Sequence, residues 1–164
     1  MALLIALAAA LTLGGAWAFQ MAGYVPCELC LKERLPYYAA VPVALLTLGA
    51  VLRERRDAAI GGFVLLILIF VAGTALGLYH TGVEWKVWPG PSECSGAFTA
   101  PAKVDDFLKQ LDRTAVVRCD EAAIRLFGLS LALWNALVCM ALLGLANLGL
   151  LRSATLGRGG VARR

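Results

Sequence analysis

The chain has 164 residues, of which 60% are hydrophobic and only 16% are charged. This composition is typical of a membrane protein and excludes an ordinary water-soluble globular domain, and the length suits one domain. The formal net charge of +4 does not indicate nucleic-acid binding, because its distribution follows the membrane topology described below.

Four runs of the sequence contain no Asp, Glu, Lys or Arg: Met1–Cys27, Leu35–Leu52, Ala58–Val83 and Leu126–Leu151. A helix needs about 20 apolar residues to cross a bilayer, and each run is long enough. Four separate spans must be helical, because lipid offers the backbone no hydrogen-bond partner. We therefore expect one all-α membrane domain over residues 1–164. Its four-transmembrane-helix bundle has spans at about 2–19, 35–52, 58–79 and 126–151, and outer loops at about 20–34 and 80–125.

The first apolar run also resembles a secretory signal peptide, since Ala16-Trp17-Ala18 has the small residues of a cleavage site. No Lys or Arg precedes the run, however, so the positively charged region of a signal peptide is missing. We therefore expect the first helix to be retained.

Arginine residues predict the orientation of the bundle. The turn Arg53–Asp57 contains three Arg, and the segment after Leu151 contains four Arg and no acidic residue. Connections rich in Lys and Arg remain in the cytoplasm. With an even number of spans, both termini and this turn face the cytoplasm, and the loops at 20–34 and 80–125 face outward.

The five cysteines separate by location. Cys27, Cys30, Cys94 and Cys119 lie in the outward loops, where disulfides persist in a compartment such as the bacterial periplasm. Cys139 lies within the fourth span, where we interpret it as a small buried apolar residue.

The stretch Tyr24–Arg34 contains the Cys27–Cys30 pair in a Cys-x-x-Cys motif. Pro26 favours an extended backbone at Val25 and delays the next helix. A helix beginning near Cys30 would place this thiol at a positive helix end, which lowers a thiol pKa. It would also place Arg34 at i+4 on the same face. An interfacial Arg34 that extends to water is an equally weighted alternative.

Four further features have structural interpretations. Gly73-Thr-Ala-Leu-Gly77 is a GxxxG pattern that predicts helix packing, and a buried Asn135 is expected to find a partner across a helix interface. His80 ends the third span, where a lone histidine is most often a cap or surface residue. Residues 104–113 have one apolar helix face and predict a short helix that lies in the membrane interface or packs on the bundle.

The outward cysteines allow three interpretations. Stable structural disulfides are disfavoured at Cys27–Cys30, because closing so short a loop constrains the chain little. A four-cysteine zinc site is disfavoured because 24 residues separate Cys94 from Cys119 in the sequence, unlike the tight spacing of most zinc sites. Thiol–disulfide exchange suits close cysteines of lowered pKa. A lipid-soluble quinone is then the acceptor by elimination, since haem (CxxCH) and nucleotide (GxGxxG) motifs are absent.

The combined motifs resemble the disulfide bond formation protein B (DsbB) family of quinone-linked bacterial oxidases, over nearly the whole chain. The matching stretches are Pro26–Arg34, Tyr79-His80-Thr81, Trp88-Pro-Gly-Pro-x-x-Cys94, Cys119-Asp-Glu, Phe127-Gly-Leu-Ser and Trp134-Asn135. The resemblance implies a multi-pass protein of the bacterial inner membrane with its redox loops in the periplasm.

The same resemblance implies a relay between two disulfides. A reduced DsbA-like protein of thioredoxin fold attacks the Cys94–Cys119 disulfide at Cys94. The released Cys119 attacks Cys27 and frees Cys30 as a thiolate, which reduces ubiquinone (or menaquinone). Arg34 and His80 match family positions beside the quinone, and no metal is implied.

Two alternatives remain open from the sequence. A vitamin K epoxide reductase-like protein also combines four helices, a CxxC motif and a quinone, but there the motif lies on the last helix. A non-catalytic membrane scaffold would use the cysteines as structural disulfides. The segment between Cys94 and Cys119 is also shorter than in the best-known members of the DsbB family, and its composition differs. This leaves the choice of partner protein open.

Overall fold

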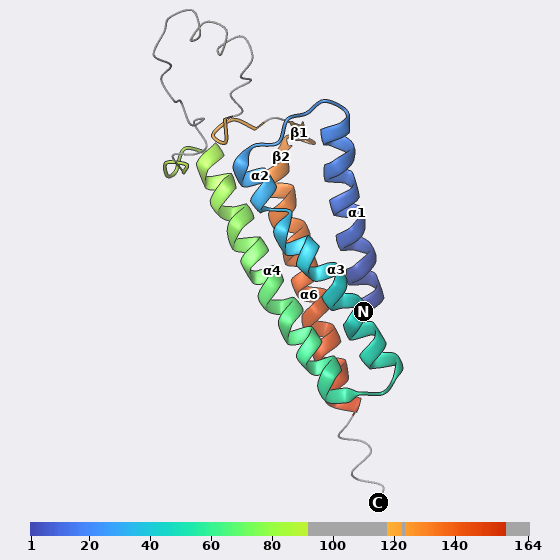
Figure 1. Cartoon of the computed structure of the whole chain (residues 1–164). Coiled ribbons are helices and arrows are strands. Elements are labelled where there is room, and N and C mark those ends of the chain that lie inside the picture. Colours follow the sequence, from blue (N-terminus) through green and yellow to red (C-terminus); the bar gives the residue numbers. More distant parts are fainter. Residues whose placement is uncertain (92–117, 123, 157–164) are drawn as a thin grey trace, which may run out of the picture.

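The computed structural model describes residues 1–91, 118–122 and 124–156. Within these ranges four long helices lie side by side in an elongated bundle (Figure 1): α1 (Ala2–Met21), α3 (Leu35–Leu52), α4 (Arg56–Glu84) and α6 (Leu131–Leu156). Three short elements gather at one end of the bundle: α2 (Glu28–Lys32), β1 (Arg125–Leu126) and β2 (Leu129–Ser130). All four long helices are long and apolar enough to cross a membrane, which confirms the predicted all-α bundle.

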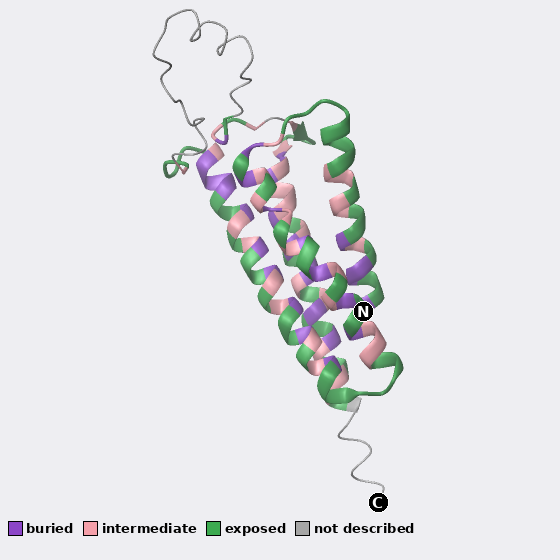
Figure 2. Cartoon of the chain, viewed as in Figure 1, coloured by how far each residue is buried: buried purple, intermediate pink, exposed green. Residues whose placement is uncertain are grey.

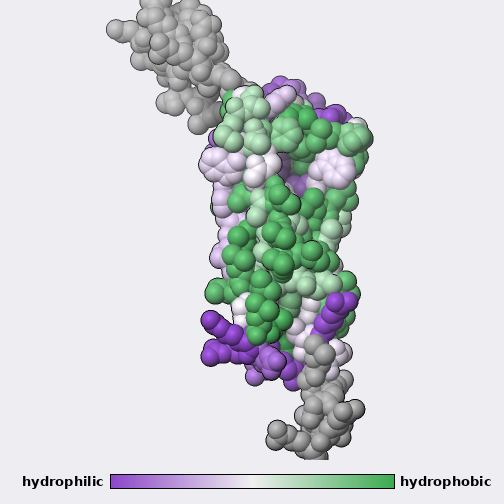
Figure 3. Space-filling view, turned by 90° about the vertical axis from the view of Figure 1, so that its right-hand side faces the viewer, coloured by the Kyte–Doolittle hydropathy of each residue, from purple (hydrophilic) through white to green (hydrophobic). Residues whose placement is uncertain are grey.

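The surface of the bundle has the polarity of a membrane protein. Side chains such as Ile5, Leu66 and Phe70 are buried in one apolar core cluster, and Figure 2 shows buried positions along the length of the bundle. Large apolar residues such as Leu46 and Leu68 are exposed, and the apolar mid-section is bordered by hydrophilic residues at both ends (Figure 3). This pattern suits a bundle whose outer surface contacts lipid.

Small residues bring α4 close to its neighbours, as the GxxxG pattern predicts. A Cβ atom added at Gly77 would lie 3.0 Å from the backbone nitrogen of Ala136 on α6. At Gly73 it would meet the Sγ of Cys139 at 2.9 Å and the ring of Pro36 on α3. The predicted packing role of the two glycines is confirmed.

Three of the helices differ in length from the approximate spans expected from the sequence, whereas α3 has the expected bounds of 35–52. Helix α1 continues to Met21, and α4 extends from Arg56 to Glu84 because charged residues complete its ends. The fourth span begins at Leu131 and not at residue 126, because Phe127 and Gly128 have φ values of 52° and 81°. Two successive left-handed residues form a hairpin turn between β1 and β2 and exclude a helix there.

Polar side chains form hydrogen bonds with free backbone groups at both ends of α6. The backbone N–H of Leu133 donates to the Ser130 hydroxyl at the first turn. At the other end, the Arg56 guanidinium donates to the carbonyls of Ser153 and Ala154 and satisfies groups that a helix end leaves free. The predicted interfacial helix at 104–113 lies outside the described residues.

Candidate redox site

The Cys27–Cys30 disulfide begins α2 at the same end of the bundle as the β hairpin. The two Cα atoms are 5.0 Å apart. Cys27 is the N-cap residue, with φ −74° and ψ 167°, and its Sγ accepts a hydrogen bond from the Cys30 backbone N–H at 3.1 Å. The helix therefore begins at Glu28, before the predicted start at Cys30, so the sulfur that caps it belongs to Cys27.

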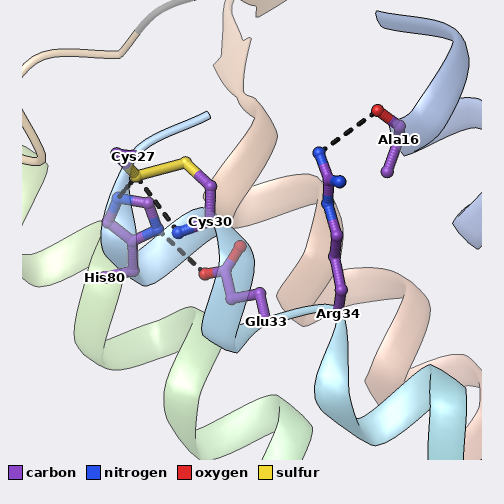
Figure 4. The surroundings of a disulfide bond; sticks show 6 residues. All are labelled: Ala16, Cys27, Cys30, Glu33, Arg34 and His80. Carbon is purple, nitrogen blue, oxygen red and sulfur yellow. Dashed lines mark hydrogen bonds and ion pairs between the residues drawn. A yellow bond between two sulfur atoms is a disulfide. The ribbon is translucent and has the colours of Figure 1, made fainter. Parts of the chain in front are cut away.

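A buried histidine–carboxylate pair lies beside this disulfide (Figure 4). The Nε2 of His80 is 3.7 Å from the Sγ of Cys27, and its Nδ1 is 2.9 Å from the Oε1 of Glu33. The side chains of His80 and Glu33 are almost completely buried. When the Nδ1 of a neutral ring donates its proton to the Glu33 carboxylate, Nε2 is the unprotonated nitrogen, and the ring also makes a hydrogen bond to the backbone of Cys119. The interpretation of His80 as a cap or surface residue was therefore wrong.

Arg34 points toward α1 and away from the disulfide (Figure 4). Its guanidinium donates to the Oε1 of Gln20 at 2.7 Å and to the carbonyl of Ala16 at 3.2 Å. The Trp17 ring lies 5.9 Å from its central carbon, within the range of a cation–π contact. The predicted i+4 pairing with Cys30 was wrong because α2 ends at Lys32, before Arg34 is reached. The predicted extension of Arg34 to water is also replaced by these contacts with α1.

A cavity of about 270 Å³ connects these groups. Its wall is mainly apolar, and its polar members include Glu33, Arg34, His80 and Asn135. The hydroxyl of Tyr37 on α3 donates to the Oδ1 of Asn135 on α6 at 2.6 Å, which confirms the partner expected across a helix interface. Among the described residues, the Nδ2 of Asn135 is a buried donor without a hydrogen-bond partner.

Cys119 lies next to this disulfide. Its side chain is buried in one apolar cluster with Cys27, Leu29 and Val83. Cys119 is itself disulfide-bonded, and Cys94, the other half of the predicted pair, lies outside the described residues. Cys30 packs against the same cluster, so three of the four predicted redox cysteines, from loops far apart in sequence, are brought together.

Charged residues flank Cys119 on the loop before β1. The Arg118 guanidinium makes two hydrogen bonds to the Asp120 carboxylate, at 2.9 Å and 2.7 Å. These bonds hold the pKa of the Asp120 carboxyl below its ordinary value. The loop therefore presents a paired cation and anion beside Cys119.

Sequence reasoning missed Glu33 and did not assign Asn135 to the site. A signal for Glu33 exists in the sequence, because a carboxylate at the start of a span needs a partner and His80 is the only histidine. Cys139 is a free, buried thiol, as predicted, and lies 3.3 Å from the Tyr37 hydroxyl.

Comparison with known proteins identifies the family. The uncharacterized protein RP370 of Rickettsia prowazekii (strain Madrid E) is 26% identical over 122 residues, which cover 73% of this chain and 68% of that protein. The sequence profile of the disulfide bond formation protein DsbB family matches residues 1–149. In its described residues the chain has four helices long and apolar enough to cross a membrane and a disulfide at the start of α2, and it belongs to the DsbB family of membrane disulfide-bond formation proteins.

Proposed function

We propose that this protein reoxidises a DsbA-like dithiol oxidase of thioredoxin fold in the bacterial periplasm and passes the electrons to ubiquinone in the inner membrane. The observation that carries this proposal is the burial of Cys119 in one cluster with Cys27. A relay between two disulfides requires a sulfur of one pair to reach a sulfur of the other. A scaffold with two independent structural disulfides has no such requirement.

The exchange steps conserve two electrons. A thiolate of the partner attacks Cys94, breaks the Cys94–Cys119 bond and releases Cys119 as a thiolate. The second thiolate of the partner then attacks the mixed disulfide, so the partner leaves oxidised and Cys94 is free. Cys119 attacks the Sγ of Cys27, which forms a Cys27–Cys119 bond and releases Cys30 as a thiolate. When Cys94 attacks Cys119, the outer disulfide is restored and Cys27 and Cys30 carry the two electrons.

The cavity beside Cys30 fits a quinone head group. Its wall is mainly apolar and can contact the faces of the quinone ring. The unpartnered Nδ2 of Asn135 can donate a hydrogen bond to a carbonyl oxygen of the quinone. Arg34 contributes a fixed positive charge on the wall. A bound quinone supplies an acceptor for two electrons and two protons, and menaquinone has the same acceptor chemistry.

The residues around the disulfide have distinct roles in this proposal. The backbone N–H of Cys30 stabilises negative charge on the sulfur of Cys27. The imidazole of His80, oriented by Glu33, holds or releases a proton beside the same sulfur. Arg34 favours negative charge in the cavity through its guanidinium.

The test is quinone reduction by the purified protein in detergent, with reduced DsbA as electron donor and a soluble ubiquinone analogue as acceptor. We expect turnover that disappears in separate Cys30→Ser and Cys94→Ser variants and persists in Cys139→Ser, the matched control at the free thiol. Turnover with dithiothreitol but not with DsbA would retain the quinone site and reject the partner. Normal turnover in Cys30→Ser, or none with either donor, would contradict the relay.

A further inference from the structure

The disulfide and His80 together form a set of metal-binding atoms. One sulfur from each of Cys27 and Cys30 and one ring nitrogen of His80 all lie within 4.8 Å of one another. Zinc in proteins is bound by cysteine sulfur and histidine nitrogen. A Cys-x-x-Cys pair is also a component of the sequence patterns that are typical of zinc sites.

The histidine is oriented as a metal ligand would be. Its Nδ1 is paired with the buried Glu33 carboxylate at 2.9 Å, while its Nε2 lies 3.7 Å from the Sγ of Cys27. The ring also makes a hydrogen bond to the backbone of Cys119. Metal-binding histidines usually donate their second ring N–H to a carboxylate, which fixes the tautomer and raises the basicity of the ligand. The same arrangement is present here, as Figure 4 shows.

The remaining coordination position has space available. Cys27, Cys30 and His80 all line the cavity of about 270 Å³, so a water molecule can complete the shell. Three protein ligands and one open position are typical of an accessible zinc site, whereas structural sites are closed by four. Cys30 is partly exposed, which gives an ion a route to the sulfurs.

Only the reduced pair can bind the ion, because a disulfide has no thiolate. Two electrons and two protons from a dithiol convert the Cys27–Cys30 bond to two thiols. An incoming Zn²⁺ then displaces both thiol protons and forms two Zn–S bonds, with no further change in oxidation state. The metal-bound state and the disulfide therefore exclude each other.

We propose that the reduced protein binds one zinc ion through Cys27, Cys30 and His80, with Glu33 as the residue that orients the histidine. The site is absent in the oxidised protein. Bound zinc holds both sulfurs as thiolates that are shielded from electrophiles and from reoxidation. Binding does not depend on the proposed quinone or on the identity of the partner.

The experiment uses the full chain with Cys94→Ser and Cys119→Ser, so that Cys27, Cys30 and the buried Cys139 are the remaining cysteines. The protein is reduced, freed of reductant without oxygen, and titrated with Co²⁺ as a spectroscopic substitute for Zn²⁺. We expect one Co²⁺ per chain with thiolate-to-cobalt charge-transfer absorption, which Zn²⁺ abolishes by displacement. Equal binding to the oxidised protein, or no charge-transfer absorption, would overturn the proposal.

Variants identify the ligands. Glu33→Gln should weaken Co²⁺ binding by about 10-fold, as loss of an outer-shell partner does, and His80→Ala should weaken it further because a ligand is lost. Cys139→Ser should bind as the parent does. An unchanged affinity in His80→Ala would contradict the assigned ligand set.

A second measurement does not depend on the folding of any His80 variant. In the reduced Cys94→Ser, Cys119→Ser protein, Zn²⁺ should slow alkylation of Cys27 and Cys30 by at least about 10-fold. A thiolate bound to a metal ion is a weaker nucleophile than a free thiolate. Mass spectrometry assigns the modified residues, and Cys139 provides the internal reference. Alkylation of Cys27 and Cys30 at the same rate with and without Zn²⁺ would reject the site.

Discussion

At the scale of single residues, the Glu33–His80 pair distinguishes this site from a simple CxxC motif. A carboxylate and an imidazole are buried together beside a disulfide in a mainly apolar environment. Burial of either group alone would be costly, and removal of one partner leaves the other without compensation. The pair therefore orients the Nε2 of His80 toward Cys27, and this orientation can be tested separately from the cysteines.

We expect Glu33→Gln to lower quinone-reduction turnover by about 10-fold or more, because a neutral amide no longer fixes the tautomer and basicity of His80. The readout that separates positioning from folding is the pH–rate profile, which should shift in the variant. Glu28→Gln is the matched control, since Glu28 begins the helix that Glu33 caps but is exposed. An unchanged rate and pH profile in Glu33→Gln would show that the pair only fills space.

The second residue-scale prediction concerns the unpartnered Nδ2 of Asn135. Asn135→Leu should raise the KM for the quinone analogue by about 5- to 10-fold, equivalent to one hydrogen bond of about 1 kcal/mol, with a smaller effect on kcat. Tyr37→Phe is the control, because it removes the Tyr37–Asn135 hydrogen bond and leaves Nδ2 in place. Equal KM increases in both variants would assign the effect to the lost Tyr37 contact.

At the scale of elements, the contact between α4 and α6 determines where the site residues meet. Helix α4 contributes His80, and α6 contributes Asn135. The absence of a side chain at Gly77 lets the two backbones approach, since an added Cβ would meet three atoms of Ala136. The close contact of these helices thus supports the site at the end of the bundle.

Gly77→Ala should destabilise the folded protein by about 1–3 kcal/mol, because the added methyl group meets backbone atoms that cannot rotate away. Unfolding in mixed micelles, monitored by circular dichroism, measures the change. Gly61→Ala on the same helix is the control, as nothing lies within 4 Å of its added Cβ, and it should be neutral or slightly stabilising. Equal stability of the two variants would mean that α4 and α6 do not pack closely in solution.

At the scale of the whole molecule, the charged ends of the bundle predict its orientation. The Arg53–Asp57 turn lies at the end opposite the disulfide (Figure 1), so a cytoplasmic turn places the redox site in the periplasm. Alkaline phosphatase, active only outside the cytoplasm, should be active when fused after Gly90 and inactive when fused after Arg55. The reverse pattern would invert the topology and remove the proposed partner from reach of the site.

The sequence alone determined the number and type of the apolar helices, and it drew attention to the cysteines as candidate redox residues. Charge-free runs of bilayer length have few alternatives in lipid, and α3 has its predicted bounds. The hairpin before α6 was missed because Phe127 adopts a left-handed backbone that a large apolar side chain does not signal.

Only the tertiary structure decided how the site is assembled. Glu33 and His80 are 47 positions apart, and Tyr37 and Asn135 are 98 apart, so no local pattern could pair them. Arg34 contacts α1 because the chain bends between α2 and α3, whereas the predicted continuous helix would have directed it to Cys30. Local spacing specifies the neighbours within one helix, but the neighbours across helices depend on packing in three dimensions.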